Sequence, residues 1–337
     1  MFKKSAKSTL SNEEALSYIL KEAEKYLTDT EFIPLTSAYN RILANDVVSD
    51  IDIPGADTSS RDGFCLNASS IAGYTLGSAV TLKVKKSEVH AGHVVNSIKK
   101  DECVYIATGG VLPEGADAVV QFEDVDLNKA KTEITIKIPV KTGDFVRKKA
   151  SEGKIGDVAA EKFSIIEPEL AGKIVSAGTF MVKVFKKPVV AILTSGDEIV
   201  MPWEKPEPWQ VRTSNPTVMS MLVEKYGGKC LDFGIAKDTG SNMLELFKQT
   251  VQSADVVVTS GGIAMGRHDP VRNMFEKLGI ESAFQKYGSH FRPVFYAEYK
   301  GKPIFALPGT PSGMFRIFEK FVGPFLQAIG GAKHSLG

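Results

Sequence analysis

Acidic side chains stand at positions that are typical of turns, where a carboxylate can reach a ligand or a metal ion. They are Asp62, Asp197, Glu198, Asp238 and Asp269. Carboxylate oxygens suit Mg²⁺ that is bound together with the phosphates of a substrate. Structural alternatives stay open, since Asp269 could cap a helix and Asp62 could be a turn residue.

A glycine-rich segment, Ser260-Gly261-Gly262-Ile263-Ala264-Met265-Gly266, follows an apolar stretch. Glycines at such a place let backbone N–H groups approach a phosphate, which predicts phosphate binding. The alternative is a tight turn without a ligand. The sequence has neither a Walker loop nor the GxGxxG pattern, so ordinary NTPase and dinucleotide functions have no support.

His90 and His93 form an HxxH pair without a nearby cysteine or a third ligand. An open zinc site needs at least three protein ligands, so we expect solvated loop histidines.

The aromatic residues predict core packing in one place and an exposed loop in another. Trp203 and Trp209 bracket a proline-rich loop that would cover a site or form a subunit contact, and both alternatives stay open. Four phenylalanines recur at helical spacing and are interpreted as core rather than as a stacking platform: Phe315, Phe318, Phe321 and Phe325.

The elements that would position these residues form two patterns. From residue 188 onward, apolar stretches at 189–193, 256–258 and 304–307 each enter a turn of small residues, which predicts a parallel sheet with crossover helices. Ligands of such sheets bind beyond the carboxyl ends of the strands. We expect helices from Ser214-Asn215-Pro216 to Gly227-Gly228 and from Asp269-Pro270 to Gly279.

The N-terminal half has a different character. Ser11 and Glu14 read as a capping box that opens an amphipathic helix. Residues 47–139 alternate apolar and polar side chains and predict a mainly β unit. Residues 140–180 contain a glycine-punctuated segment followed by a helix rich in Ile, Leu and Ala.

Length, net charge and cysteine content limit the classes of protein to which the chain can belong. The 337 residues carry a formal net charge of +1, which offers no global field for nucleic acid or an anionic membrane. The length predicts two or more domains. Three scattered cysteines fit a reducing cytoplasm, and neither a signal peptide nor a membrane-spanning apolar stretch is present, so we expect a cytoplasmic protein.

Several segments in one order resemble the MoeA family, which includes the E domain of gephyrin. The resemblance covers nearly the whole chain. Its segments are Ser59-Ser60-Arg61-Asp62-Gly63-Phe64, residues 106–120, Thr194-Ser195-Gly196-Asp197-Glu198, residues 255–262 and Leu307-Pro308-Gly309-Thr310-Pro311.

The resemblance implies a multidomain α/β fold, with elongated helical and β N-terminal domains before a parallel-sheet molybdopterin-binding domain. The implied domains are a discontinuous framework domain (residues 1–46 plus 140–180), a mainly β domain (47–139) and the α/β domain (181–330). The chain ends near where the family's fourth, small β domain would begin, so we expect that domain to be absent.

The resemblance also implies a reaction and an assembly. Adenylylated molybdopterin and molybdate are substrates, Mg²⁺ assists hydrolysis of the phosphoanhydride, and molybdenum passes to the dithiolene with release of AMP. The active site of the implied homodimer lies between two subunits, and a molybdopterin adenylyltransferase is an implied partner. Neither nucleic acid nor a membrane is expected.

Site residues follow from the matching segments. The implied catalytic residues are Asp62, Glu198 and Asp269, and the implied metal ligands are Glu198, Asp238 and Asp269. Asp62 and Thr108 would come from the partner subunit. The implied residues that bind the substrate are Thr108, Ser195, Gly196, Ser260, Gly261, Gly262, Lys286, His290, Pro308 and Pro311.

Departures from the family's pattern keep two other functions open. Ala264 replaces a usual Ser, Glu152 replaces a usual Asp, and residues 289–293 replace a lysine-rich stretch, so His290 and Arg292 would offer a differently aimed positive field. A catalytically silent binding scaffold is one alternative. The other is a Mg²⁺-dependent hydrolase of nucleotide derivatives, because residues 181–330 also resemble a domain of competence-damage-inducible proteins.

Overall fold

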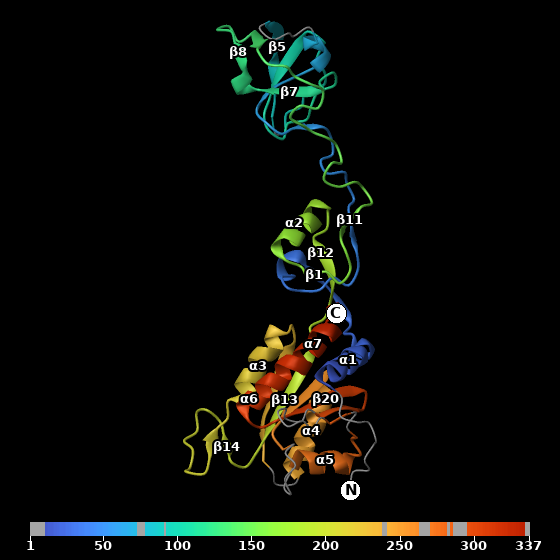
Figure 1. Ribbon diagram of the computed structural model, residues 1–337, viewed down its shortest axis with the longest axis vertical. Helices are drawn as coiled ribbons and strands as arrows, with labels where there is room; N and C mark the ends of the chain where they lie inside the picture. The colour runs from blue at the N-terminus through green and yellow to red at the C-terminus, as the bar shows by residue number, and fades with distance from the viewer. Residues whose placement is uncertain are drawn as a thin grey trace. The chain divides into compact units, whose positions relative to one another are not determined.

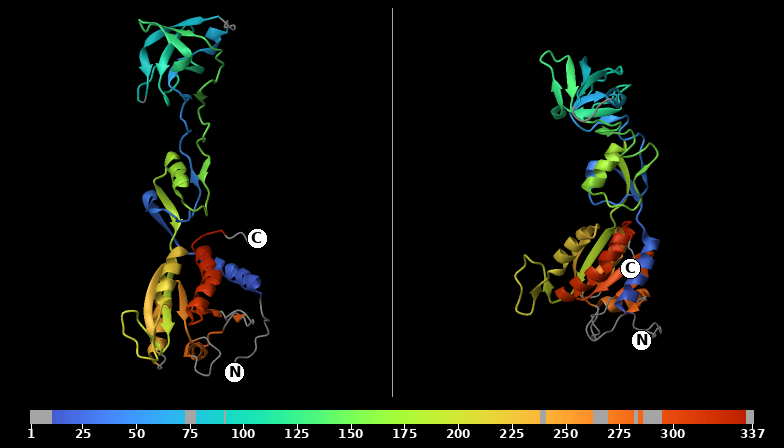
Figure 2. Two further views of the ribbon diagram at one scale, coloured as in Figure 1. Left: turned by 60° about the vertical axis from the view of Figure 1, so that its left-hand side comes forward. Right: turned by 45° about the horizontal axis from the view of Figure 1, so that its top comes forward.

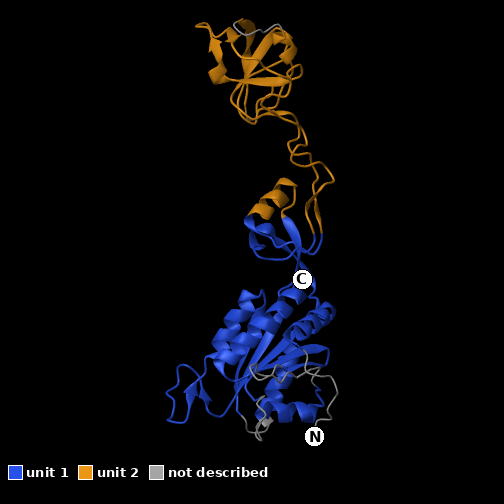
Figure 3. Ribbon diagram, in the orientation of Figure 1, with its two compact units in different colours: residues 1–45, 162–168, 181–337 blue, residues 46–161, 169–180 orange. Residues whose placement is uncertain are grey.

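The computed structural model describes residues 11–72, 78–90, 92–237, 241–262, 270–281, 284–285 and 295–333. By its internal packing the chain forms two compact units, which Figure 3 shows in different colours. The α/β unit comprises residues 1–45, 162–168 and 181–337, and the β unit comprises residues 46–161 and 169–180. The division into three domains that the sequence suggests stays a prediction, whereas the multidomain α/β class is confirmed.

A six-stranded sheet forms the centre of the α/β unit. Its first four strands are parallel to one another, and the last two strand pairings of the sheet are antiparallel. The strand order is β16 (Lys229–Ala236), β13 (Val189–Ser195), β17 (Val256–Ser260), β20 (Lys302–Leu307), β19 (Phe295–Tyr299) and β18 (Phe284–Gln285). The predicted parallel strands are therefore confirmed. Thr194 pairs with Ser260 and Ser260 pairs with Leu307, so β13, β17 and β20 end at the same edge.

Helices cover both faces of this sheet. One face packs against α1 (Asn12–Ala23), α3 (Asn215–Lys225), α6 (Pro311–Ile317) and α7 (Gly323–Ile329) (Figure 1). The other face packs against α4 (Ser241–Ser253) and α5 (Pro270–Leu278). Successive side chains of a strand point to opposite faces, so Val258 joins the first core and Val257 the second. Strands buried on both faces explain the continuous apolar stretches in the sequence.

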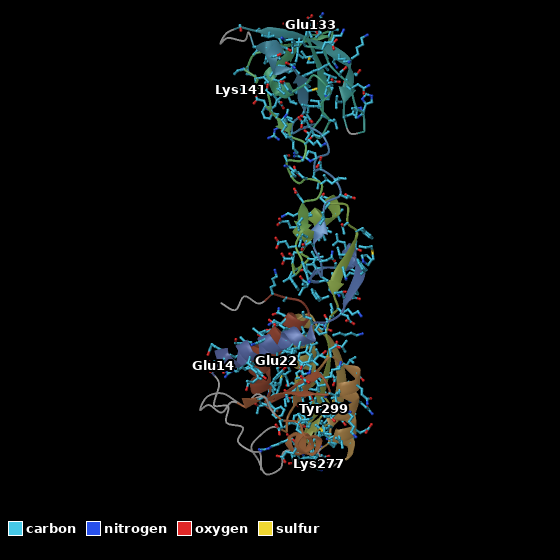
Figure 4. The ribbon with its side chains drawn as sticks, turned by 90° about the vertical axis from the view of Figure 1, so that its right-hand side faces the viewer. Glu14, Glu22, Glu133, Lys141, Lys277 and Tyr299 are labelled. Carbon is cyan, nitrogen blue, oxygen red and sulfur yellow. The ribbon has the colours of Figure 1, made fainter. Side chains whose placement is uncertain are left out.

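The first helix begins with the predicted capping box. The N–H of Glu14 donates to Ser11 Oγ at 3.1 Å, and the N–H of Ser11 donates to Glu14 Oε2 at 2.5 Å. Glu14 is exposed and Glu22 is partly buried on α1 (Figure 4), while Ala15 and Ile19 are buried. Because α1 contacts α7 (Figure 2), this helix is part of the core of the α/β unit.

The predicted helix limits are confirmed for α3 and α5. Gly227 follows α3 with φ +80°, and Gly279 follows α5 with φ +66°. Phe318, Phe321 and Phe325 are buried as predicted, but Phe315 is 45% exposed and does not belong to the core. Met314 occupies the buried position of that turn, and Phe315 lies one residue further around the helix.

The β unit contains a second six-stranded sheet, which confirms the mainly β prediction. Its strand order is β7 (Ala118–Gln121), β4 (Gly63–Leu66), β6 (Glu102–Ile106), β5 (Val80–Val89), β9 (Glu133–Ile136) and β8 (Val125–Leu127). Leu82, Ile134 and Ile136 point into its core, whereas Thr81 and Lys83 are exposed. The alternation that the sequence shows is therefore the alternation of buried and solvent-facing sides.

Short strand pairs and one helix add to the two units. β1 (Thr30–Pro34) pairs with β12 (Met181–Phe185) in the α/β unit. β2 (Val47–Val48) pairs with β11 (Val158–Ala160), and β3 (Thr58–Ser59) with β10 (Val146–Arg147), in the β unit. The helix expected within residues 140–180 is α2 (Pro168–Ser176). None of the helices in the described part of the chain has the length and apolar character needed to cross a membrane.

Candidate functional site

The turns that follow β17 and β20 touch each other at the carboxyl edge of the sheet. The N–H of Gly261 donates to the carbonyl of Leu307 at 3.1 Å. Ser260 Oγ donates to the carbonyl of Pro308 at 3.3 Å. The structure thus brings Ser260, Gly261 and Pro308 together, three residues that the sequence analysis assigned to substrate binding.

The turn after β13 joins the same place through Ser195. Gly261 has φ +95°, and a side chain there would collide with the carbonyl of Ser195. Gly262 has φ +64°, and an added Cβ would lie 2.7 Å from Val271 Cγ2 and 3.1 Å from Ser195 Oγ. Both positions need glycine for backbone conformation and for space. The result is bare backbone next to a serine hydroxyl, which is a surface suited to phosphate oxygens.

Ser195 Oγ is buried and has no hydrogen-bond partner among the described residues. Buried polar atoms are usually paired, so an unpaired hydroxyl beside a glycine turn indicates a place for a ligand or water.

Asn215 belongs to this cluster, and the sequence analysis missed it. Its side-chain Nδ2 donates to Ser260 Oγ at 2.7 Å and to the carbonyl of Gly309 at 2.8 Å. The pattern Ser214-Asn215-Pro216 by itself predicts only a helix start. An asparagine next to the N-cap position was a signal, since such a residue can serve a neighbour instead of its own helix.

Glu198 follows β13 and is exposed. Gly196 has φ +150°, and an added Cβ would lie 2.7 Å from Glu198 Oε2, so this carboxylate folds back over the glycine. Pro311 begins α6 and is exposed. Glu198 therefore lies close to the end of β13, where the sequence analysis placed a metal ligand.

The remaining predicted residues of this half lie outside the described residues: Asp238, Asp269, Lys286, His290, and with them Ala264 and residues 289–293. Within the described part of the chain there is no group of three or more His, Cys, Asp or Glu residues that could hold a metal ion. The Mg²⁺ site stays a prediction.

Asp62 and Thr108 meet in the β unit. The carboxylate Oδ1 of Asp62 accepts hydrogen bonds from the N–H of Thr108 at 2.6 Å and from Thr108 Oγ1 at 2.8 Å. These bonds, the backbone one first, lower the pKa of Asp62 below its ordinary value. Asp62 is exposed and follows β3. The next residue, Gly63, begins β4, and a Cβ there would collide with the carbonyl of Val120. The carboxylate is therefore held ionised and oriented at the surface.

The remaining predictions concern a histidine pair, two tryptophans and Glu152. His90 and His93 are exposed and stack with ring centroids 5.1 Å apart, and His93 Nδ1 lies 2.7 Å from the carbonyl of Glu88, which confirms loop histidines. Trp203 and Trp209 are both exposed, and the choice between a site cover and a subunit contact stays open. Glu152 forms an exposed ion pair with Arg147 at 3.3 Å.

The cysteines of the chain are Cys65, Cys103 and Cys230. All three are free. Cys65 and Cys103 lie in the cores of the β unit, and burial raises the pKa of each thiol to about 12. They are not reactive groups of the candidate site.

Comparisons with known families match nearly the whole chain. Residues 10–178 match the MoeA N-terminal region (domain I and II), and residues 191–328 match a probable molybdopterin binding domain. The molybdopterin molybdenumtransferase of Staphylococcus aureus strain Mu50 is 32% identical over 307 residues, which cover 89% of this chain and 71% of that protein. That of Haemophilus influenzae is 28% identical over 306 residues, 91% of this chain and 74% of that protein.

Solved structures of MoeA proteins are similar to this chain over most of its length. A molybdopterin biosynthesis MoeA protein from Pyrococcus horikoshii superposes with a TM-score of 0.80 at 32% identity, over 94% of this chain and 80% of the other. A second structure of a MoeA protein from this organism gives a TM-score of 0.82 at 26% identity, over 97% and 81%. With the family models, these relatives and the paired strand-end turns in agreement, the chain belongs to the MoeA family of molybdenum cofactor biosynthesis proteins.

Proposed function

We propose that this protein inserts molybdate into adenylylated molybdopterin and releases AMP. The observation that carries the proposal is the cluster of Ser195, Gly261 and Gly262 at adjoining strand ends. The two glycines leave the backbone bare, and the buried hydroxyl of Ser195 beside them has no hydrogen-bond partner among the described residues. The molybdopterin molybdenumtransferase name of the relatives supports the same reaction class.

The glycine turns would bind the phosphates of the substrate. Backbone N–H groups without a neighbouring Cβ approach phosphate oxygens closely, and Ser195 Oγ would add a hydroxyl donor. The same surface would also be formed by Ser260, Gly196, Pro308 and Pro311. Lys286 and His290 would supply positive charge that neutralises phosphate and molybdate.

Mg²⁺ would be held by Glu198, Asp238 and Asp269. The donor chemistry fits this ion, because Glu198 is an exposed carboxylate folded over Gly196 that forms no ion pair with any described residue. When bound, the ion would neutralise negative charge that develops on the phosphoanhydride.

Asp62 and Thr108 would reach the substrate from the partner subunit of a homodimer. The two hydrogen bonds from Thr108 lower the pKa of Asp62, so this group is a carboxylate at neutral pH. It would act as an acceptor that orients the attacking water, not as an acid. The oxygen of that water would bond to phosphorus, the phosphoanhydride bond would break, and AMP would leave.

The source of the substrate and the location of the enzyme follow from the same reaction. A molybdopterin adenylyltransferase would provide the adenylylated substrate, because a phosphoanhydride must be made before it can be hydrolysed. The enzyme would work in the cytoplasm, where its three free cysteines stay reduced.

Complementation tests the proposal. Expression in a strain that lacks its own insertase should restore nitrate reductase activity at ordinary molybdate concentration, and the empty vector is the control. Absence of activity despite folded, soluble protein contradicts the proposal.

A purified assay separates the two alternative functions. The insertase should release AMP from adenylylated molybdopterin in a molybdate-dependent manner. A hydrolase would cleave small pyrophosphates without molybdate, and a binding scaffold would show no heat of binding with molybdopterin, AMP or molybdate.

A further inference from the structure

The side chain of Asn215 connects two strand-end turns that are far apart in the sequence. Nδ2 donates to Ser260 Oγ, at the end of β17, at 2.7 Å, and to the carbonyl of Gly309, after β20, at 2.8 Å. Asn215 is the first residue of α3 and only 2% exposed. One buried amide group thus joins a helix start to both turns.

The orientation of this amide follows from its partners. The carbonyl of Gly309 can only accept a hydrogen bond, so the NH₂ side of Asn215 must face it. Oδ1 then faces away and has no partner within the described residues. An unpaired buried acceptor destabilises the fold, so this arrangement is not the one that stability alone would favour.

Asn215 does not serve its own helix. An asparagine at a helix start commonly caps the first turn with its side chain. In α3 the N-cap position is Ser214, whose side chain makes no capping hydrogen bond. Asn215 instead directs both of its N–H donors toward the sheet edge.

The two turns are packed closely enough that small shifts would matter. A Cβ added to Gly309 would lie 3.3 Å from Gly261 Cα, and Ser260 Oγ also donates to the carbonyl of Pro308 at 3.3 Å. A shift of the Ser260 side chain or of the Gly309 backbone would therefore displace the backbone N–H groups of the turn at Ser260–Gly262. Binding groups misplaced by about 1 Å lose much of their effect.

We propose that Asn215 is a positioning residue that holds the turn at Ser260–Gly262 and the turn at Pro308–Gly309 in the arrangement that binds the phosphate of the substrate. This inference rests on the proposed function, which puts a phosphate at these turns. Asn215 itself does not donate to the phosphate, since both of its N–H donors are used by Ser260 and Gly309 and its Oδ1 can only accept a hydrogen bond.

The test compares Asn215→Asp, which keeps the size but loses both N–H donors, with the wild type. Calorimetry with 5′-AMP measures the phosphate site directly. We expect the Kd of Asn215→Asp to rise about tenfold or more, which corresponds to about 1.4 kcal/mol.

Thr250→Val is the matched control. Thr250 is fully buried in α4, on the opposite face of the sheet, and donates to the carbonyl of Phe247 at 2.6 Å. This variant also loses a buried hydrogen bond, so its Tm should fall while its AMP affinity stays at the wild-type value. Should Asn215→Asp not fold, Asn215→Ser removes the same donors without a charge and carries the same expectation.

The outcomes separate the two proposals. Wild-type affinity in the Asn215 variant, or an equal loss in Thr250→Val, overturns the positioning role and leaves the proposed function intact. If the wild type itself does not bind AMP, both proposals fall together.

Discussion

Asp62 and Thr108 are joined by two hydrogen bonds to a single carboxylate oxygen, from the backbone N–H at 2.6 Å and from the hydroxyl at 2.8 Å. The residues are far apart in the sequence and lie on neighbouring segments beside β4 and β6. The pair makes Asp62 an oriented anion at the surface of the β unit.

Replacing Thr108 by Val should raise the pKa of Asp62 toward its ordinary value, because the hydroxyl donor is lost while the backbone donor remains. Carboxyl-carbon NMR titration measures this pKa. Thr142→Val is the control, since Thr142 Oγ1 donates to Asp117 at 3.0 Å in the same unit. The titration of Asp62 should not change in that variant.

The same pair predicts the direction of a pH effect on stability. The folded-state pKa of Asp62 is lowered, so its contribution is present above the unfolded pKa of about 3.9 and is lost as pH falls through the folded value. The difference in unfolding free energy between wild type and Thr108→Val should therefore be largest above about pH 5 and shrink in more acidic solution. A difference that grew toward acid pH would contradict the assignment.

Asp62→Ala should abolish molybdenum insertion and leave the protein folded. The side chain is exposed and makes no core contact, so its loss removes an anion without creating a cavity. The insertase complementation assay and a thermal melt measure the two effects. Asp126→Ala is the control, because Asp126 is an exposed aspartate of the same unit that pairs with Lys137. It should retain activity, and an active Asp62→Ala would remove this residue from the site.

Gly262→Ala should lose AMP affinity and stability together. Its backbone has φ +64°, which costs an L residue about 1–2 kcal/mol, and the added Cβ would also lie 2.7 Å from Val271 Cγ2.

Gly279→Ala isolates the backbone part of that effect. Gly279 has φ +66° and nothing within 4 Å of an added Cβ. Denaturant unfolding should show the smaller loss of stability in this variant, and its AMP affinity should match the wild type. Equal AMP affinity in both variants would argue against a phosphate at residue 262.

The thiols should react in a definite order with an alkylating reagent at neutral pH. Cys230 is partly exposed, whereas burial raises the pKa of Cys65 and of Cys103 to about 12. Peptide mass spectrometry should therefore find Cys230 modified first and the other two modified only under denaturing conditions. Early modification of Cys65 would contradict its place in the core.

Much of the fold could be predicted because local patterns and burial agree. Apolar stretches at 189–193, 256–258 and 304–307 became parallel strands, and glycines at 227 and 279 followed helices where they were expected. Phe315 was mispredicted because spacing identifies a helical face only approximately, and Met314 occupies the buried position.

The sequence by itself determined the ordered segments, the glycine turns and the family. Only the tertiary structure decided that Asn215 serves two turns, that Gly262 lies against Val271, and that Thr108 is the partner of Asp62. The reason is physical. Strand and turn formation depends on neighbours within a few residues, whereas a side-chain hydrogen bond depends on which distant segments the packed sheet brings within about 3 Å.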